Sequence, residues 1–224
     1  MKLSSRLQCV ADQVPSDACL IDIGTDHGLL PGILLHRNRI RKGIAIDVNK
    51  RPLQKAKLLR ATLGLEPVAF ATILANGLQG VSIPESSVVC IAGMGARTMI
   101  QILNAVTVEQ FRNISNLILQ PNQEVHRIRQ WCWDNNWFLH QEQMVHENNK
   151  YYVVLHLHPT LGISSGDERD ALVGPLFLKD KPQVWRNWIQ SRVLFLHEMQ
   201  KQLGGQFPAS YQRELDCLHG IETV

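Results

Sequence analysis

Apolar runs of four to seven residues alternate along the first 135 positions with segments whose apolar residues recur at helical spacing. Such runs are typical of buried strands, and the spaced segments are typical of amphipathic helices. The pattern predicts a helix from Leu3 to Val14, capped by Ser4 or Ser5 and ended by Pro15. It then predicts strands over 19–23, 43–47, 67–73, 88–92 and 116–119, and helices over 28–37, 52–63, 96–104 and 123–135. This alternation indicates an α/β fold with a parallel sheet covered on both faces.

Two further strand-like runs, Trp137–His146 and Tyr151–His158, are separated by only four residues. A connection this short cannot hold a crossover helix, so the two strands must pair antiparallel. A parallel sheet closed by an antiparallel hairpin is the seven-stranded, Rossmann-like layout of class I methyltransferases, and ordinary NAD-binding domains lack that hairpin. This assignment of the fold class rests on an analogy between folds.

The chain beyond residue 160 has a different pattern. Residues 161–166 read as a hinge, and Gly204-Gly205 ends a long helix that follows it. The apolar stripe of that helix consists of Val184, Trp185, Trp188, Ile189, Val193, Leu196, Met199 and Leu203, and a shorter stripe consists of Leu215, Leu218 and Ile221. We therefore expect one domain over 1–160 and a helical domain over 161–224, built on an antiparallel helix pair.

The net charge of +3 is unevenly distributed along the chain. Residues 1–65 hold 11 Lys or Arg against 5 Asp or Glu, whereas residues 66–160 and 161–224 carry net charges of −2 and −1. The basic cluster consists of Arg37, Arg39, Arg41, Lys42, Lys50, Arg51, Lys55, Lys57 and Arg60. Such a cluster suits a phosphate backbone. The alternative is an ordinary solvated helix face.

Composition also bears on the cellular location. No segment approaches the roughly 18 uninterrupted apolar residues of a membrane span, and the first residues lack the apolar stretch of a signal peptide. The five cysteines are odd in number and scattered, which favours reduced thiols. We expect a cytoplasmic protein with no membrane partner and no obligate protein partner.

The loop after the first predicted strand carries the most specific chemistry. Gly24 and Gly28 are present, but Asp26 stands where a G-x-G-x-x-G dinucleotide motif needs its second glycine. A carboxylate there repels phosphates and suits a cationic ligand, so the loop favours S-adenosylmethionine over NAD. Asp47 ends the second strand 23 residues after Gly24, near the spacing of roughly 20 expected for a ribose-binding acid. The alternative for Asp26 is a helix cap.

Short polar or glycine residues follow the other predicted strands, and loops at the carboxyl ends of such strands bind ligands. Asn76 offers an amide carbonyl to an adenine amino group, or is a turn residue beside Gly77. Gly93-Met94-Gly95 leaves room for a flat substrate, or is simply a tight turn. The motif Asn/Asp-Pro-Pro-Tyr/Phe of exocyclic-amine methylases is absent there. A ring-nitrogen acceptor fits this loop better, because it requires mainly alignment.

Asp26 is the candidate to stabilise the cation formed on a ring nitrogen or to take an amino proton.

The other candidate groups are weaker. His156 and His158 point to one strand face, but no Cys or carboxylate pattern completes a zinc site, so no metal is expected. Trp131, Trp133 and Trp137 either stack a flipped base or belong to the core. His27 lies in the cofactor loop and either contacts ligand or packs there.

Several of these motifs stand in an order that resembles the bacterial tRNA (adenine(22)-N1)-methyltransferases. The resemblance covers nearly the whole chain and extends to Pro31 and to the tail around 173–176. It is carried by Leu3-Ser4-Ser5-Arg6-Leu7, Asp22-Ile23-Gly24-Thr25-Asp26-His27, Asn76-Gly77-Leu78, Ile91-Ala92-Gly93-Met94-Gly95 and Leu117-Ile118-Leu119-Gln120-Pro121-Asn122.

The resemblance implies S-adenosylmethionine-dependent N1-methylation of an adenine in the D-arm region of tRNA, with a coiled-coil-like C-terminal helical domain. Asp26 matches the proposed catalytic aspartate of the family. The expected cofactor residues are Gly24, Thr25, Asp26, His27, Gly28, Asp47, Asn76, Gly77, Gly93 and Met94. The expected substrate residues are Arg6, Gly95, Arg97, Gln120 and Asn122.

The chain departs from the family at three places. The family usually has Asp where Asn76 stands, a Glu-containing string where Asp47 stands, and a second glycine where Ala96-Arg97 follows Gly95. Arg97 is expected to contact RNA or a neighbouring carboxylate. The leading hypothesis is a tRNA methyltransferase. The alternatives are a small-molecule N-methyltransferase and a non-catalytic S-adenosylmethionine-binding module.

Overall fold

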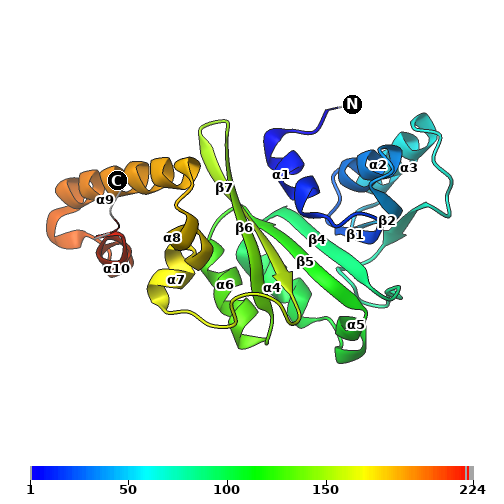
Figure 1. Cartoon of the computed structure of the whole chain (residues 1–224). Coiled ribbons are helices and arrows are strands. Elements are labelled where there is room, and N and C mark those ends of the chain that lie inside the picture. Colours follow the sequence, from blue (N-terminus) through cyan, green and yellow to red (C-terminus); the bar gives the residue numbers. More distant parts are fainter. Residues whose placement is uncertain (1, 220, 222–224) are drawn as a thin grey trace.

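The computed structural model describes residues 2–219 and 221 and is built on one seven-stranded sheet of order β3-β2-β1-β4-β5-β7-β6 (Figure 1). Strands β1 to β5 run parallel, and β7 pairs antiparallel with both β5 and β6. The predicted sheet with its terminal hairpin is thus confirmed. The strands are β1 (Ala18–Ile23), β2 (Ile40–Asp47), β3 (Phe70–Leu74), β4 (Ser87–Met94), β5 (Ile114–Pro121), β6 (Phe138–Glu147) and β7 (Lys150–His158).

Helices cover both faces of the sheet because the side chains of each central strand alternate between two apolar clusters. On β1, Leu20 belongs to the cluster that contains α1, α2 and α3, whereas Ile21 belongs to the cluster that contains α4 and α6. The predicted cap of the first helix is Ser4, whose Oγ accepts a hydrogen bond from the Leu7 N–H (3.2 Å). These helices are α1 (Ser5–Gln13), α2 (Leu29–His36), α3 (Lys50–Thr62), α4 (Ala96–Asn104) and α6 (Val125–Asp134).

Three short helices were not expected from the sequence: α5 (Val108–Arg112), α7 (Glu168–Val173) and α8 (Pro175–Asp180). They are too short to show an apolar period. Local capping signals nevertheless mark two of them, because Thr107 and Asp167 each form a capping box with the residue three positions later. The third begins with Pro175, a residue suited to a first helical turn.

The C-terminal helices continue the core of the sheet. Trp185 and Ile189 of α9 (Gln183–Leu203), and Leu215 and Leu218 of α10 (Ala209–Leu218), belong to the same apolar cluster as the α4 face. Residues 161–166, expected as a hinge, are held against β6: Ile163 and Leu139 exchange two backbone hydrogen bonds of 2.9 and 3.0 Å.

A buried ion pair also fastens this region to the sheet. The Nε of Arg129 on α6 lies 2.6 Å from Oε1 of Glu142 on β6, and both side chains are at most 1% exposed. Arg129 donates to the Ala171 carbonyl (2.7 Å), and Glu142 accepts from the Leu176 N–H (3.2 Å). This pair of side chains, which joins α6 to β6, thus also binds backbone groups of α7 and α8.

The long helix ends at Gly204, as predicted, but the expected antiparallel helix pair is wrong. In Figure 1, α9 runs across the view whereas α10 is seen nearly end-on, so the two helices cross. The bidentate contact of Arg192 with Glu214 (2.6 and 2.8 Å) fixes the crossing point. None of the described helices is long and apolar enough to cross a membrane.

Candidate active site

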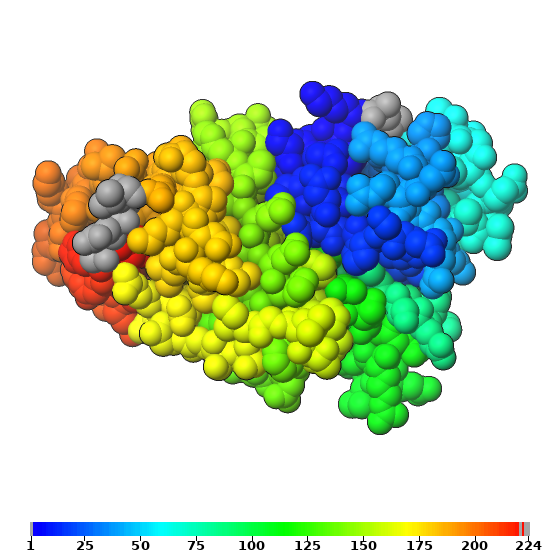
Figure 2. All heavy atoms as spheres, viewed as in Figure 1, coloured from blue at the N-terminus to red at the C-terminus, as the bar shows by residue number. Residues whose placement is uncertain are grey.

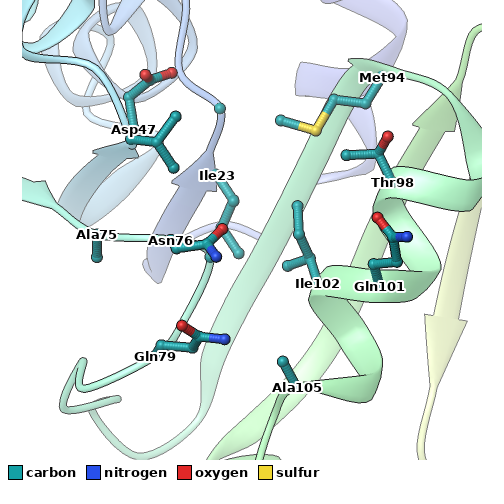
Figure 3. A pocket seen from close by; sticks show the side chains of 13 residues that line it. Ile23, Asp47, Ala75, Asn76, Gln79, Met94, Thr98, Gln101, Ile102 and Ala105 are labelled. Atoms are coloured by element: carbon teal, nitrogen blue, oxygen red, sulfur yellow. The ribbon is translucent and has the colours of Figure 1, made fainter.

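Loops from four parallel strands meet at one edge of the sheet. Gly24 follows β1, Asp47 ends β2, Asn76 follows β3 and Met94 ends β4, and all four residues line a single cavity of about 280 Å³ (Figure 3). The carboxyl ends of parallel strands necessarily share an edge, which is why residues spread over 70 positions come together. The prediction that these residues form one site is consistent with this geometry.

Asp47 and Asn76 occupy one side of this first cavity. Asp47 Oδ1 accepts a hydrogen bond from the Asn49 N–H (2.7 Å), and its other oxygen has no protein partner among the described residues. Gly77 has a φ of +59°, and a Cβ there would lie 2.8 Å from the Ile102 side chain. Glycine therefore lets the Asn76 loop close against α4.

The opposite wall belongs to α4 and was missed from the sequence. Thr98, Gln101, Ile102 and Ala105 line the cavity, and their spacing of three, four and seven positions from Thr98 puts them on one face of the helix (Figure 3). The sequence feature that could have predicted this wall is the pair of polar residues on that face, Thr98 and Gln101, shortly after the Gly-Met-Gly loop. The wall thus combines hydrogen-bonding groups with apolar area.

A second cavity of about 250 Å³ lies between the start of α1 and the β1–α2 loop. Lys2 and Arg6 supply positive charge to it, and Asp22 and Asp26 supply negative charge. Its apolar lining consists of Leu3, Leu7, Leu29, Leu30 and Ala92. A cavity that holds both signs of charge is suited to a zwitterionic group.

The two cavities share Gly24 as a common wall. Gly24 has a φ of +70°, and a Cβ at this position would collide with the terminal methyl of Met94. Only glycine both adopts this backbone conformation readily and leaves room for the Met94 side chain beside it. Gly24 and the Met94 methyl therefore stand at the junction of the two cavities.

Asp22 is a site residue that the sequence-based prediction omitted. It is 6% exposed, and its Oδ2 accepts a hydrogen bond from the Thr25 hydroxyl (2.5 Å). Burial raises the pKa of Asp22 to about 6, and the nearby carboxylates of Asp26 and Asp47 also raise it. Asp22 is therefore a buried acid poised to respond to a cation in the second cavity.

Asp26 does not cap α2, so the alternative interpretation of this residue is wrong. The N-cap is Gly28, and no side chain caps this helix. The Asp26 side chain is 84% exposed at the second cavity, and its Oδ1 lies 3.2 Å from His27 Nε2. The same ring nitrogen lies 2.6 Å from Lys55 Nζ. His27 thus packs between the catalytic candidate and a cation of α3.

Arg6 is brought to the ends of β4 and β5 by α1. Its Nη1 donates to Gln120 Oε1 (2.5 Å), and its guanidinium lies 5.6 Å from the centre of the Tyr152 ring. A Cβ on Gly93, whose φ is +79°, would lie 3.4 Å from the same Nη1. Arg6 therefore lines the second cavity in a fixed orientation.

The remaining predicted site residues support the loops. Gln120 is fully buried, so it orients Arg6 from below and does not line either cavity. Asn122 donates from Nδ2 to the Gly93 carbonyl (2.7 Å), and its N–H donates to the Met94 carbonyl (2.8 Å). Gly95 is the N-cap of α4. These contacts join the ends of β4 and β5.

Three other predicted residues are also placed outside the cavity walls. Thr25 is 1% exposed and holds Asp22. Gly28 has a φ of +68°, and a Cβ there would lie 2.7 Å from Phe70, so it allows close packing of α2. The Arg97 side chain is 72% exposed and pairs with Glu124 (3.3 Å). This contact confirms the expectation that Arg97 contacts a neighbouring carboxylate.

The aromatic and histidine candidates belong to the core and to the hairpin. Trp131, Trp133 and Trp137 are 6–9% exposed in an apolar cluster, which confirms the core alternative. Burial lowers the pKa of His156 to about 4, and its Nε2 contacts Asn116 Oδ1 (2.7 Å). Among the described residues, no group of three or more His, Cys, Asp or Glu is arranged to hold a metal ion.

Comparison with protein families and known proteins places this geometry in context. Residues 3–155 match a family model described as a methyltransferase domain. The tRNA (adenine(22)-N(1))-methyltransferase of Bacillus subtilis (strain 168) is 31% identical over 202 residues, which cover 85% of this chain and 81% of that protein.

Solved structures agree over almost the full length. Streptococcus pneumoniae Sp1610 in complex with S-adenosyl-L-methionine aligns with a TM-score of 0.85 at 29% identity, over 98% of this chain and 99% of that one. M. capricolum TrmK in complex with S-adenosyl-homocysteine aligns with a TM-score of 0.87 at 26% identity, over 100% of both chains. The likeness therefore includes the C-terminal helices as well as the sheet.

Proposed function

Since this chain belongs to the tRNA (adenine(22)-N1)-methyltransferase family, we propose that it transfers the methyl group of S-adenosylmethionine to N1 of adenine 22 in tRNA. In this proposal residues 1–160 form the catalytic domain and residues 161–224 form the helical domain. The observation that carries the proposal is the junction of two chemically different cavities at Gly24. Each cavity suits one half of the methyl donor.

The first cavity suits the adenosine half. The free carboxylate oxygen of Asp47 is a hydrogen-bond acceptor for ribose hydroxyls, and the Asn76 amide offers an acceptor to the adenine amino group. Ile102 and Met94 supply apolar area for the faces of the base. Asn76 in place of the usual aspartate keeps the acceptor but removes the charge.

The second cavity suits the amino-acid half. Arg6 is positioned to bind the carboxylate, and Asp22 and Asp26 are positioned to bind the ammonium group. This proposal moves Arg6 from the expected tRNA-contact set to the cofactor set, because Gln120 fixes it inside the cavity. The wall of the second cavity thus offers a positive charge to the carboxylate and negative charges to the ammonium group of the cofactor.

When bound, S-adenosylmethionine supplies a methyl group on a positively charged sulfur. The N1 lone pair lies in the plane of the adenine, so the base must leave its stack, at a cost of a few kcal/mol, and point N1 at the junction. A new N–C bond then forms, the S–C bond breaks with its electron pair left on sulfur, and the positive charge moves to the adenine. The exposed carboxylate of Asp26 is placed beside the junction to stabilise this charge.

The test is to incubate the full chain with methyl-labelled S-adenosylmethionine and unmodified tRNA transcripts, and then to identify the labelled nucleoside. N1-methyladenosine that disappears when adenine 22 is replaced by guanine supports the proposal. Labelling at another adenine corrects the position. Cofactor binding without any labelled nucleoside contradicts the proposal and leads back to the small-molecule or non-catalytic alternatives.

A further inference from the structure

One segment of the surface is unusually rich in positive charge. Between residues 27 and 65 the chain holds nine Lys or Arg residues and a single Asp or Glu, Asp47. Five of these cations are solvent-exposed, and we call them the basic track: Arg37, Arg41, Lys50, Arg51 and Lys57.

The structure corrects the picture of one compact cluster, because these cations lie at both ends of the sheet. Lys50 and Arg51, three and four positions after Asp47, open α3 at the edge that holds the active site. Arg37 follows the last turn of α2, and Arg41 lies near the start of β2, so both occupy the opposite edge.

Helix α3 connects these two ends. Its 13 residues span about 20 Å at about 1.5 Å per residue. Lys57 lies seven positions after Lys50 on the same exposed face, midway along the helix. Neighbouring phosphates of a nucleic-acid strand are only a few ångströms apart along its axis, so this length spans several of them.

The charge of the basic track is not neutralised by neighbouring carboxylates. Within residues 2–219 and 221, no ion pair joins any track residue to an acidic side chain. Arg37 instead donates to the neutral Gln8 side chain (3.3 Å). The four arginines that do pair with a Glu lie elsewhere, on α4, α6 and α9: Arg97, Arg127, Arg129 and Arg192.

The C-terminal helices lie at the other end of the molecule. In Figures 1 and 2, α2 and α3 are at one extremity and α9 and α10 are at the opposite one. Residues 161–224 carry a net charge of −1, and Arg192 is paired with Glu214. The electrostatic potential is therefore most positive on the α2–α3 side.

Resting on the proposed function, we propose that the tRNA backbone lies along the basic track, from the active-site edge down α3 to Arg37 and Arg41. Phosphates outside the D-arm would then contact the far end of the track while the target adenine is at the junction. The track starts beside the cavity that the base must reach, which favours a folded RNA over an anionic membrane surface as the partner.

Three double variants of equal charge test this surface. Arg37→Gln/Arg41→Gln alters the far end, and Lys50→Gln/Arg51→Gln alters the near end. The matched control is Lys179→Gln/Lys201→Gln, which removes two exposed charges from the C-terminal helices. Each variant is assayed for tRNA affinity against salt concentration and for methylation of full-length tRNA and of an isolated D-arm hairpin.

We expect both track variants to bind full-length tRNA about tenfold more weakly. The slope of log affinity against log salt should become smaller by roughly two, because about one ion is released per phosphate contact. The far-end variant should raise KM for full-length tRNA but leave KM for the hairpin unchanged, since the hairpin does not extend that far. Cofactor affinity, kcat and the melting temperature should stay as in the original protein.

Three results would overturn the track. The first is a far-end variant that binds and methylates tRNA like the control. The second is a control variant that weakens tRNA binding as much as the track variants do. The third is that the unaltered protein binds vesicles of anionic lipid but does not bind tRNA. Failure of the track is distinguishable from failure of the proposed function. An unaltered chain that methylates tRNA while the track variants keep the original salt slope refutes only the track.

Discussion

Arg6 on α1 and Gln120 at the end of β5 are 114 positions apart in the chain, yet Arg6 Nη1 donates a hydrogen bond of 2.5 Å to Gln120 Oε1. This contact fixes Arg6, which among the described residues is the only arginine that lines either of the two cavities. Through it, the N-terminal helix becomes part of a site that is otherwise built from the ends of the strands and from residues of α2 and α4.

Arg6→Gln is expected to weaken binding of S-adenosylmethionine by about 10- to 100-fold, because a charge-assisted hydrogen bond is worth roughly 1.5–3 kcal/mol. Isothermal calorimetry measures this loss. The matched ligand is 5′-methylthioadenosine, which lacks the amino-acid group and should bind both proteins equally. Equal losses for the two ligands would show that Arg6 supports the fold of the site and does not bind the carboxylate.

Asp26→Ala is expected to lower kcat by a factor of 100 or more, because the positive charge on the methylated adenine then lacks its counter-charge. Asp26 is exposed, so the melting temperature should be unchanged. Single-turnover methylation of tRNA measures the chemical step, and Asp12→Ala on the exposed face of α1 is the control. Full activity of Asp26→Ala would remove this residue from the mechanism.

Asp22 makes cofactor binding dependent on pH. Its pKa is raised to about 6, and a bound ammonium group favours its ionised form, so binding expels a proton below that pH. Affinity should be constant above about pH 7 and fall about tenfold per unit below pH 6. Calorimetry in two buffers of different ionisation enthalpy measures the released proton. A pH dependence that persists in Asp22→Asn would assign it to another group.

The substitution Asp22→Asn should also stabilise the protein in the absence of cofactor. Between pH 4 and 6 the folded state binds more protons at Asp22 than the unfolded state, so its contribution to stability falls as pH rises through that window. Asp22→Asn removes this penalty, and we expect roughly 1–3 kcal/mol of added stability at pH 7.5. Urea denaturation at pH 4 and pH 7.5 measures it, with a gain expected only at the higher pH.

The buried pair of Arg129 and Glu142 should dominate the attachment of the C-terminal helices. Arg129→Met leaves Glu142 buried without its partner, which costs about 3–5 kcal/mol. Denaturation and limited proteolysis after residue 160 measure the effect. Arg97→Gln, in an exposed pair, should cost less than about 1 kcal/mol. Similar losses from both substitutions would contradict the role assigned to burial.

The order of the elements could be predicted from local pattern because strands, crossover helices and tight turns each depend on nearby residues. The helix over 96–104 and the antiparallel hairpin were obtained in this way. The short helices α7 and α8 were missed, since six residues hold no measurable period and tertiary contacts decide whether they form.

For the site, the chain itself determined the glycines with positive φ, Asp26 in the loop and Asp47 at the end of its strand. These follow from backbone sterics and from the common edge of parallel strands. Only the tertiary structure decided that Arg6 lines the cavity, that Asp22 titrates near pH 6, and that the basic residues divide between two edges. Burial and long-range contacts set these properties. The pKa of a side chain depends on the groups that surround it in space, and the effect of a surface charge depends on whether an opposite charge lies nearby.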